Sequence, residues 1–383
     1  MIVLAAVLEG AFATGILELS TFDVYVYRDY GEAMVGRAAP YRDFAVEYPP
    51  GSLALFVLPA LVSDDLTAYQ LFFADGMLLA ATAMLAGVRR LERRVAGAGV
   101  ATTFPVVFVF ALAALLGSVA FTRFDLVPAA LTVGALLALT ADRRLIAAVA
   151  LGTAIAVKLY PAVLLPAVVI HVAQRQGRRA AVEVAALTLL VVAIVYAPFV
   201  VLSPSGVLES LDAQLFRSLQ IESLPGSLFA AVHRLFGDLP PQSDYYDLPG
   251  RSADIVGAAS AGIGVSVLIV LWIAQARLPA APRTLIRFSA AGVATFVAFG
   301  KVFSPQYLIW LIPLVSLVGG VRGRIASGLL FVACLLTAVG FPRFFDALRF
   351  DVAATPLAAI VARDVLVVSV VAVLSWPRSF RAG

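Results

Sequence analysis

Long apolar runs separated by short polar segments form the pattern of this chain. A helix that crosses a bilayer upright needs about 20 mainly apolar residues, and fewer where it is held inside a bundle. The pattern therefore predicts an all-α, polytopic transmembrane bundle of about 12 spans. The twelve candidate runs are residues 2–20, 67–88, 99–120, 125–141, 145–157, 160–172, 180–201, 254–274, 287–302, 306–320, 325–341 and 355–375.

Arginine clusters follow every second run. Loops rich in arginine are cytoplasmic by the positive-inside rule, so a single alternating path places all of these clusters inside the cell. The long loops 21–66, 202–253 and 342–354 are then external, and they hold most of the acidic residues. The clusters are Arg89, Arg90, Arg93 and Arg94; Arg143 and Arg144; Arg175, Arg178 and Arg179; Arg277, Arg283 and Arg287; Arg322 and Arg324; and Arg378 and Arg381.

Two stretches of the chain are not described by a simple count of apolar runs. Residues 145–172 must go out and back between two arginine clusters, which predicts two short helices that turn at KLYP, where Pro161 breaks the helix. In the first external loop, residues 24–35 suit a short helix on the membrane surface, and residues 51–63 are apolar but too short to span. We therefore expect this loop to carry interfacial helices and to lie as a lid against the bundle.

Composition agrees with lipid as the main solvent of the chain, since 62% of residues are hydrophobic, 14% are charged and the mean hydropathy is +0.97. The net charge of +4 comes with arginines placed between apolar runs, so nucleic acid is not an expected partner. The single cysteine, Cys334, permits no intrachain disulfide. Residues 2–20 lack a basic start and carry Glu9 and Glu18, so we expect a first transmembrane helix and one integral membrane domain over residues 1–383.

Six motifs occur in order between residue 21 and about residue 315. Together they resemble glycosyltransferase family 87, a family of the GT-C superfamily that includes polyprenyl-phosphate-mannose-dependent mannosyltransferases of actinobacterial cell-envelope lipids. The last two spans and much of residues 229–253 carry no matching motif. The motifs are Asp-x-x-x-Tyr from Asp23 to Tyr27, PYRDFAVEYPPG at 40–51, FTRFDLVPA at 121–129, VKLYP at 157–161, ESLPGSL at 222–228 and FGKVFSPQYLIWLIPL at 299–314.

The resemblance implies a multi-pass enzyme of the plasma membrane whose active site faces the external side. Such an enzyme takes a hexose, here mannose as in the similar enzymes, from a polyprenyl-phosphate-linked donor and passes it to a lipid or glycan acceptor with inversion. Membrane lipids are further partners. No cofactor is expected. No metal is expected either, because lysines supply the positive charge at the phosphate, although a divalent ion held by Asp23 with Asp43 or Glu47 stays an alternative.

Asp23 is the candidate general base. It is the first carboxylate after the first expected span, and in similar enzymes an aspartate at this loop position activates the acceptor hydroxyl. An exposed loop carboxylate or a helix N-cap is the structural alternative. Asp43 and Glu47 are candidates for contact with sugar or acceptor, and an ion-pair network with Arg42 is their alternative. The resemblance adds Tyr27 to the sugar or acceptor contacts.

Lysine is rare in this chain: Lys158 and Lys301 are the only two, and both fall in motifs at the external ends of expected crossings. A compact ammonium suits a leaving polyprenyl phosphate, so both are candidate phosphate ligands, with simple snorkelling to the headgroup layer as the alternative. Residues beside the two lysines are candidates for contact with the sugar or acceptor, namely Tyr160, Ser304, Gln306 and Tyr307.

Two other classes of protein share parts of this pattern. A multi-span transporter or lipid flippase would have a similar number of crossings, together with internal repeats and broken helices around a midplane site. A non-catalytic assembly subunit would keep the fold and lose the base. The adjacent charges Arg363 and Asp364 lie at membrane depth, where pairing with one another is the favoured interpretation.

Overall fold

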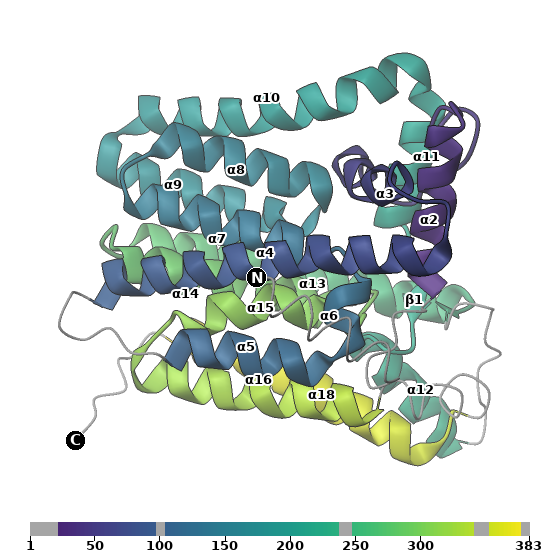
Figure 1. Ribbon diagram of the computed structural model, residues 1–383. Helices are drawn as coiled ribbons and strands as arrows, with labels where there is room; N and C mark the ends of the chain where they lie inside the picture. Colours follow the sequence, from purple (N-terminus) through teal and green to yellow (C-terminus); the bar gives the residue numbers. More distant parts are fainter. Residues whose placement is uncertain (1–21, 97–103, 237–246, 341–351, 377–383) are drawn as a thin grey trace. The chain divides into compact units, whose positions relative to one another are not determined.

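The chain folds almost entirely into helices (Figure 1). The computed structural model describes residues 22–96, 104–236, 247–340 and 352–376. The expected first crossing at 2–20, and most of the expected third external loop, lie outside the described residues. The helices gather into two compact units.

The first unit is built from two short N-terminal helices, four longer helices and several single turns. Its elements are α2 (Phe22–Val35), η1 (Pro50–Ser52), α3 (Leu53–Ala60), α4 (Leu66–Ala96), α6 (Ser118–Thr122), α7 (Leu126–Thr140), α8 (Arg144–Val157), η2 (Tyr160–Val163), α10 (Arg178–Leu202) and α11 (Pro204–Leu215).

The second unit holds most of the C-terminal half. It also takes residues 107–116 of α5 (Phe104–Leu116) and residues 166–175 of α9 (Leu164–Gln176). Its other elements are β1 (Leu219–Gln220), α12 (Leu224–Phe236), β2 (Asp247–Leu248), α13 (Arg251–Ala276), α14 (Pro282–Phe299), α15 (Tyr307–Ser316), α16 (Gly320–Gly340) and α18 (Ala354–Ser375).

Each expected crossing after residue 66 contains helix among its described residues. In lipid, a helix is one of the few structures that satisfy all backbone polar groups, so an apolar run of this length has little other choice. Within the described residues five helices, α4, α10, α13, α16 and α18, are long and apolar enough to cross a membrane. The others are shorter apolar helices, such as α7, α8 and α15. Helix α4 has 31 residues, about 46 Å of helix, and its last turn carries Arg93 and Arg94.

The predicted break at KLYP is confirmed. Helix α8 ends at Val157, and Lys158 takes an extended conformation with φ −154° and ψ 139°. Tyr160 and Pro161 then begin the single turn η2, and α9 follows from Leu164. The break turns the Lys158 side chain away from a helix axis and toward the polar groups described below.

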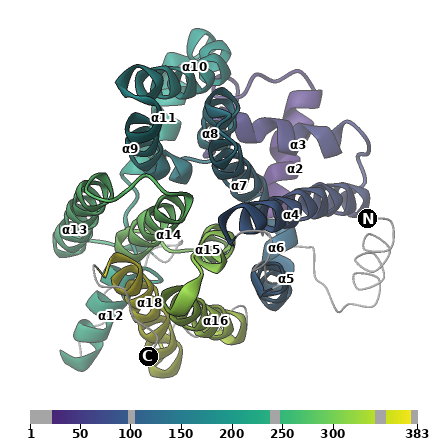
Figure 2. The same ribbon diagram turned by 90° about the vertical axis from the view of Figure 1, so that its left-hand side faces the viewer.

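In the first unit, α4 packs against α7, α7 against α8, and α8 against α10, and Figure 2 shows these helices as neighbours seen along their length. The small helix α3 packs on α4, and α2 packs on α3. Val24, Tyr27 and Gly31 form the buried face of α2. This spacing is that of one helix face, so the polar residues of α2 lie on its other sides.

The loop that precedes α4 is packed against the helices of the first unit, as the lid hypothesis predicts. At its YPPG turn, a Cβ added to Gly51 would lie 2.6 Å from the carbonyl of Ala156 near the end of α8, so glycine is needed for this close approach. Further along, the Ser203 hydroxyl donates to the Tyr41 carbonyl over 2.9 Å, and the Tyr41 ring contacts Phe199. The loop is thus tied to both α8 and the end of α10.

In the second unit, α14 and α15 are the most deeply buried helices, and every residue of α15 from Leu308 to Ser316 is buried. Helix α14 contacts α13, α15 and α18, and α16 packs along α18 (Figure 2). A helix as short as α15 has no need to reach both membrane surfaces by itself, because its neighbours surround it.

The second expected external loop, 202–253, contains structure that the apolar pattern did not predict. Helices α11 and α12 are short, and two residues of β1 pair with two of β2 in an antiparallel ladder, Leu219 with Leu248 and Gln220 with Asp247. Among the described residues, the all-α prediction therefore holds except for this small ladder and an isolated bridge between Pro40 and Phe44.

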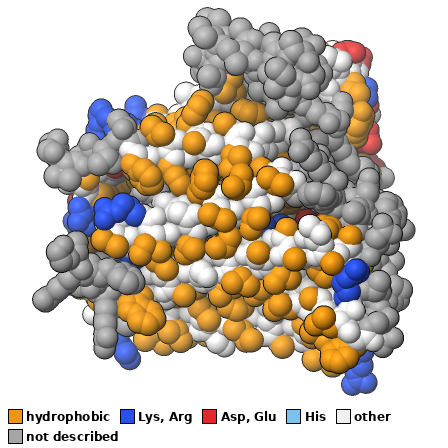
Figure 3. Space-filling model, turned by 90° about the horizontal axis from the view of Figure 1, so that it is seen from below, with side chains coloured by type: hydrophobic (Ala, Val, Ile, Leu, Met, Phe, Trp, Pro, Cys, Tyr) orange, Lys and Arg blue, Asp and Glu red, His pale blue; other side chains and the backbone are white. Residues whose placement is uncertain are grey.

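Hydrophobic side chains cover much of the surface. On α10, Val182, Leu189, Ile194 and Val201 are each more than half exposed. Figure 3 shows one face over which hydrophobic side chains are spread, with Lys and Arg side chains gathered at its margins. A surface of this kind matches a hydrocarbon environment bordered by headgroups. The protein is a multi-pass membrane protein.

Candidate active site

A three-residue link between α6 and α7 places two opposite charges on either side of a buried ring. Arg123 has an extended backbone at the end of α6, Phe124 is fully buried, and Asp125 immediately precedes α7. Arg123 pairs with Asp23 of α2, and Asp125 pairs with Lys158 after α8. The FTRFD motif thus joins the loop that precedes α4 to the KLYP break, all within the first unit.

Asp23 lies in the first turn of α2 and binds two partners. Arg123 Nη2 lies 2.5 Å from Asp23 Oδ2, and the Tyr48 hydroxyl donates to Asp23 Oδ1 over 3.4 Å. Burial, and then the neighbouring Asp23 charge, raise the pKa of Tyr48, so its hydroxyl stays protonated and acts as a donor. The side chains of Asp23 and Arg123 are 22% and 13% exposed, so the pair is accessible from one side only.

Lys158 has a carboxylate partner in the protein. Its Nζ lies 2.8 Å from Asp125 Oδ1 and 4.4 Å from the centre of the Phe124 ring. The Asp125 side chain is completely buried, whereas that of Lys158 is 16% exposed. The lysine therefore neutralises a buried carboxylate, and simple snorkelling does not describe it.

An aromatic cluster holds both ion pairs in place. Tyr27 stacks on Phe56 with ring centroids 4.4 Å apart, and Phe124 meets the edges of Tyr27, Tyr48 and Phe56 at 5.3 to 5.7 Å. Tyr27 and Tyr160 are only 1% and 2% exposed. Both rings are therefore part of the packed interior of the first unit, and their contact with sugar or acceptor stays a prediction.

Asp43 and Glu47 lie on the outer part of the loop and are exposed. Asp43 Oδ1 is 2.9 Å from Arg42 Nε, and the backbone N–H of Ala39 donates to Asp43 Oδ2 over 2.7 Å. Arg42, together with this backbone bond, lowers the pKa of Asp43 to about 2. The Glu47 backbone carbonyl accepts a hydrogen bond from Gln214 of α11. The local ion pair weighed for Asp43 is therefore present.

The second unit carries the other expected site residues on the connection from α14 to α15. Ser304 Oγ donates to Gln306 Oε1 over 2.5 Å, and the Tyr307 ring stacks on Trp310 at 4.1 Å. The Lys301 carbonyl accepts from the backbone N–H of Gln220 over 2.9 Å. The side chains of Lys301, Ser304, Gln306 and Tyr307 are half-buried.

Sequence reasoning identified Asp23 and Lys158 but not their partners Arg123 and Asp125. The signal was present, since both lie in FTRFDLVPA, a motif at the external end of an apolar run. Within the described residues, no three His, Cys, Asp or Glu side chains gather as metal ligands would. The arrangement offers a carboxylate base and two cations for an anionic group.

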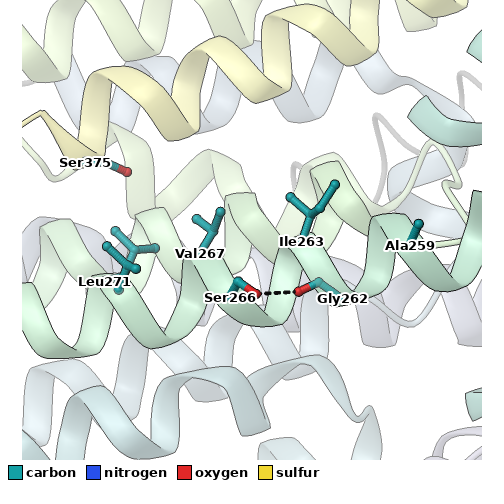
Figure 4. A pocket seen from close by; sticks show the side chains of 8 residues that line it. Ala259, Gly262, Ile263, Ser266, Val267, Leu271 and Ser375 are labelled. Carbon is teal, nitrogen blue, oxygen red and sulfur yellow. Dashed lines mark hydrogen bonds between the residues drawn. The ribbon is translucent and has the colours of Figure 1, made fainter.

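A separate hollow of about 490 Å³ lies along α13 (Figure 4). Ala259, Ile263 and Val267 line it, and the Ser266 hydroxyl is already bonded to the Gly262 carbonyl over 2.8 Å. Among the residues that line it, none is charged, so this hollow has no group for a phosphate or for acid–base chemistry.

Comparison with known proteins gives one family and one fold. The sequence profile described as glycosyltransferase family 87 matches residues 46–305. Two crystal structures of ArnT from Cupriavidus metallidurans are similar, one bound to undecaprenyl phosphate and one in the apo state. The first has a TM-score of 0.50 and 15% identity, covering 91% of this chain and 71% of that one. The second has a TM-score of 0.50 and 16% identity, covering 98% and 76%. No curated protein matches.

Proposed function

The chain belongs to glycosyltransferase family 87, and on this premise we propose that it moves a hexose from a polyprenyl-phosphate donor to a lipid or glycan hydroxyl at the external membrane face, with mannose as the first candidate. Family membership decides for a glycosyltransferase over the transporter, flippase and assembly-subunit hypotheses. ArnT shares the fold, and one of its crystal structures holds undecaprenyl phosphate, which supports a polyprenyl phosphate as the carrier.

The pairing of Asp23 with Arg123 is the observation that carries the proposal. A half-buried carboxylate between a guanidinium and a tyrosine hydroxyl has a fixed orientation and retains unused lone pairs for an incoming hydroxyl. Asp43 offers less, because its low pKa makes it a weak base and its neighbours occupy its oxygens. Asp23 is therefore the base we assign.

In the proposed reaction the acceptor hydroxyl gives its proton to Asp23 as its oxygen bonds to the anomeric carbon of the donor sugar. Attack comes from the face opposite the phosphate, so the configuration inverts as the bond from carbon to phosphate oxygen breaks. The polyprenyl phosphate leaves with the bonding electrons, and its charge is stabilised by Lys158 and Arg123. The proton on Asp23 is then released to solvent.

The remaining assignments complete the proposal. In the second unit, Lys301 is a phosphate contact, and Ser304, Gln306 and Tyr307 are contacts of the sugar or acceptor, supported by their half-buried side chains. Asp43 and Glu47 are placed at the outer edge of the acceptor path. We further propose one integral membrane domain with 12 crossings in the plasma membrane, with loops 21–66, 202–253 and 342–354 outside, supported by the arginine pattern.

The test uses the purified full chain with a panel of polyprenyl-phosphate sugars and membrane lipids, followed by mass spectrometry of the lipid products. We expect a product that is one hexose heavier than its acceptor. Asp23→Asn keeps the size of the side chain and removes the base, so turnover should fall at least ~100-fold. Asp29→Asn, an exposed change on the same helix, is the matched control.

Two outcomes contradict the proposal. If no polyprenyl-phosphate sugar gives a product, the donor class is wrong. If Asp23→Asn retains normal turnover while Asp43→Asn or Glu47→Gln abolishes it, the base is misassigned.

A further inference from the structure

Glu222 begins the ESLPGSL motif just before α12, beside two buried charges of α18. Arg363 Nε lies 2.9 Å from Asp364 Oδ1, and the Arg363 and Asp364 side chains are 3% and 1% exposed. The Ser227 hydroxyl donates to Asp364 Oδ2 over 3.3 Å, and Arg363 Nη2 donates to the backbone carbonyl of Glu222. The predicted pairing of Arg363 with Asp364 is confirmed, and the charges of this pair cancel.

The Glu222 carboxyl itself takes no part in that pairing. Its side chain is half-buried, and no residue in the described part of the chain donates a hydrogen bond to it. Burial raises the pKa of Glu222 to about 7, against the opposing effect of Arg363. Withdrawing a carboxyl from water without a hydrogen-bond partner is unfavourable, and Arg363 is already neutralised by Asp364. The ion pair between Arg363 and Asp364 therefore does not explain why the Glu222 carboxyl is withdrawn from water.

The neighbours of Glu222 contact the loop that carries Lys301. The Arg363 guanidinium lies over the Phe303 ring at 3.7 Å, and the backbone N–H of Gln220 donates to the Lys301 carbonyl over 2.9 Å. Two motifs distant in sequence, at 222–228 and 299–314, are joined here. Since the sugar of the donor is bonded directly to its phosphate, a carboxyl on a segment that is bonded to the backbone of the Lys301 loop is a candidate to meet that sugar.

We propose that Glu222 is a specificity residue whose carboxyl binds hydroxyl groups of the donor sugar. The inference rests on the proposed function, with Lys301 as a donor contact. A carboxyl suits a polyhydroxylated ligand because its two oxygens accept from neighbouring hydroxyls, and a neutral sugar adds no charge to the site. In a half-buried position such bonds are stronger than in water. These hydrogen bonds would be lost with a donor sugar in which the hydroxyl is missing or has the opposite configuration.

The experiment measures binding of two probes to the full chain in lipid nanodiscs: undecaprenyl-phosphate mannose, and undecaprenyl phosphate without sugar. The difference between their affinities isolates the sugar contacts. We expect Glu222→Gln to weaken the mannose-bearing probe about tenfold to a hundredfold and to leave the sugar-free probe unchanged. Glu222→Ala should have the same effect as Glu222→Gln on the affinity for each probe. Glu209→Gln, an exposed change on α11, is the control and should alter neither.

Each other result overturns the inference. Unchanged affinity for the mannose-bearing probe in both Glu222 variants means that the carboxyl does not touch the sugar, while the proposed function stands. An equal loss for both probes means that Glu222 supports the loop or the phosphate contact. If the wild-type chain binds neither probe, the proposed function fails together with the inference.

Discussion

At the scale of single residues, local partners decide what each aspartate of the first loop can do. Asp43 is exposed, and its ion pair with Arg42 lowers its pKa to about 2, so it remains a weak base. Asp23 is less exposed and is oriented by Arg123 and by the Tyr48 hydroxyl. The two residues have the same side chain, and only their contacts separate a candidate base from a surface ion pair.

Lys158 gives the first prediction, because its role in the fold and its role toward the donor must be separated. Lys158→Ala removes the ammonium group that pairs with the buried Asp125 carboxylate, so we expect a loss of stability of about 3 to 5 kcal/mol. In Lys158→Ala/Asp125→Asn the buried charge is removed as well, and the melting temperature should recover most of the loss. Thermal unfolding followed by fluorescence checks this.

The Lys158→Ala/Asp125→Asn double variant also tests whether Lys158 contacts the donor phosphate. If Lys158 binds the donor phosphate, the stable double variant still shows a donor KM raised about tenfold or more, with Asp125→Asn alone as the control. Wild-type kinetics in the double variant would leave Lys158 with a purely structural role.

The pH dependence of stability is a second prediction at this scale. Burial raises the pKa of Glu222 from its ordinary 4.5 to about 7. The folded chain then keeps a proton that the unfolded chain loses, so this carboxyl favours folding fully at low pH, and its contribution falls as pH rises toward about 7. Between about pH 5 and pH 8 the melting temperature of the wild type should fall relative to that of Glu222→Gln, equivalent to at most about 3 kcal/mol. Parallel curves for the two proteins would contradict the raised pKa.

At the scale of elements, the close approach of the YPPG turn to α8 predicts a sharp response to one methyl group. A Cβ on Gly51 would meet the Ala156 backbone at 2.6 Å, so Gly51→Ala must move the turn that carries Tyr48. We expect a lower melting temperature and a loss of turnover, because Tyr48 contacts Asp23. Gly134→Ala in α7, where an added Cβ meets nothing within 4 Å, is the control and should leave both unchanged or improve stability. If Gly51→Ala and Gly134→Ala had the same melting temperature and turnover, the close approach of the YPPG turn to α8 would not be needed to hold Tyr48 in place.

The sequence predicted most helices and missed the small elements between them. Apolar runs indicate helices because lipid leaves their backbone little alternative, and Pro161 marked the break before α9. Helices α11 and α12 lie in a mainly polar loop, where no such constraint acts. The ladder between Leu219 and Leu248 depends on a contact between segments distant in sequence, which periodicity does not encode.

The candidate site shows the same limit. Asp23 and Lys158 stood out because of their position and rarity, and both do hold charged partners in the first unit. Their partners Arg123 and Asp125 could not be assigned from spacing, since each pair joins residues far apart in the chain. Tyr27 was placed at the sugar from its motif, whereas its burial depends on packing against Phe56.

At the scale of the whole molecule, charge and length together determine orientation. Helix α4 is longer than the hydrocarbon core of about 30 Å, and the arginines of its last turns therefore extend beyond one membrane surface. The first loop, with its carboxylates, precedes the other end of the same helix. The positive-inside rule favours the cytoplasm for the arginine end, so we predict that the loop that holds Asp23 is external.

Cysteine labelling in intact cells tests this orientation. In a Cys334→Ser background, Arg37→Cys should react with a membrane-impermeant maleimide from outside, and Arg93→Cys should react only after permeabilisation, because one exposed position precedes α4 and the other lies in its last turn. Cys334 is buried, so its replacement removes background without exposing a new thiol. The reverse labelling pattern would place Asp23 in the cytoplasm, and an acceptor on the external face would then be out of its reach.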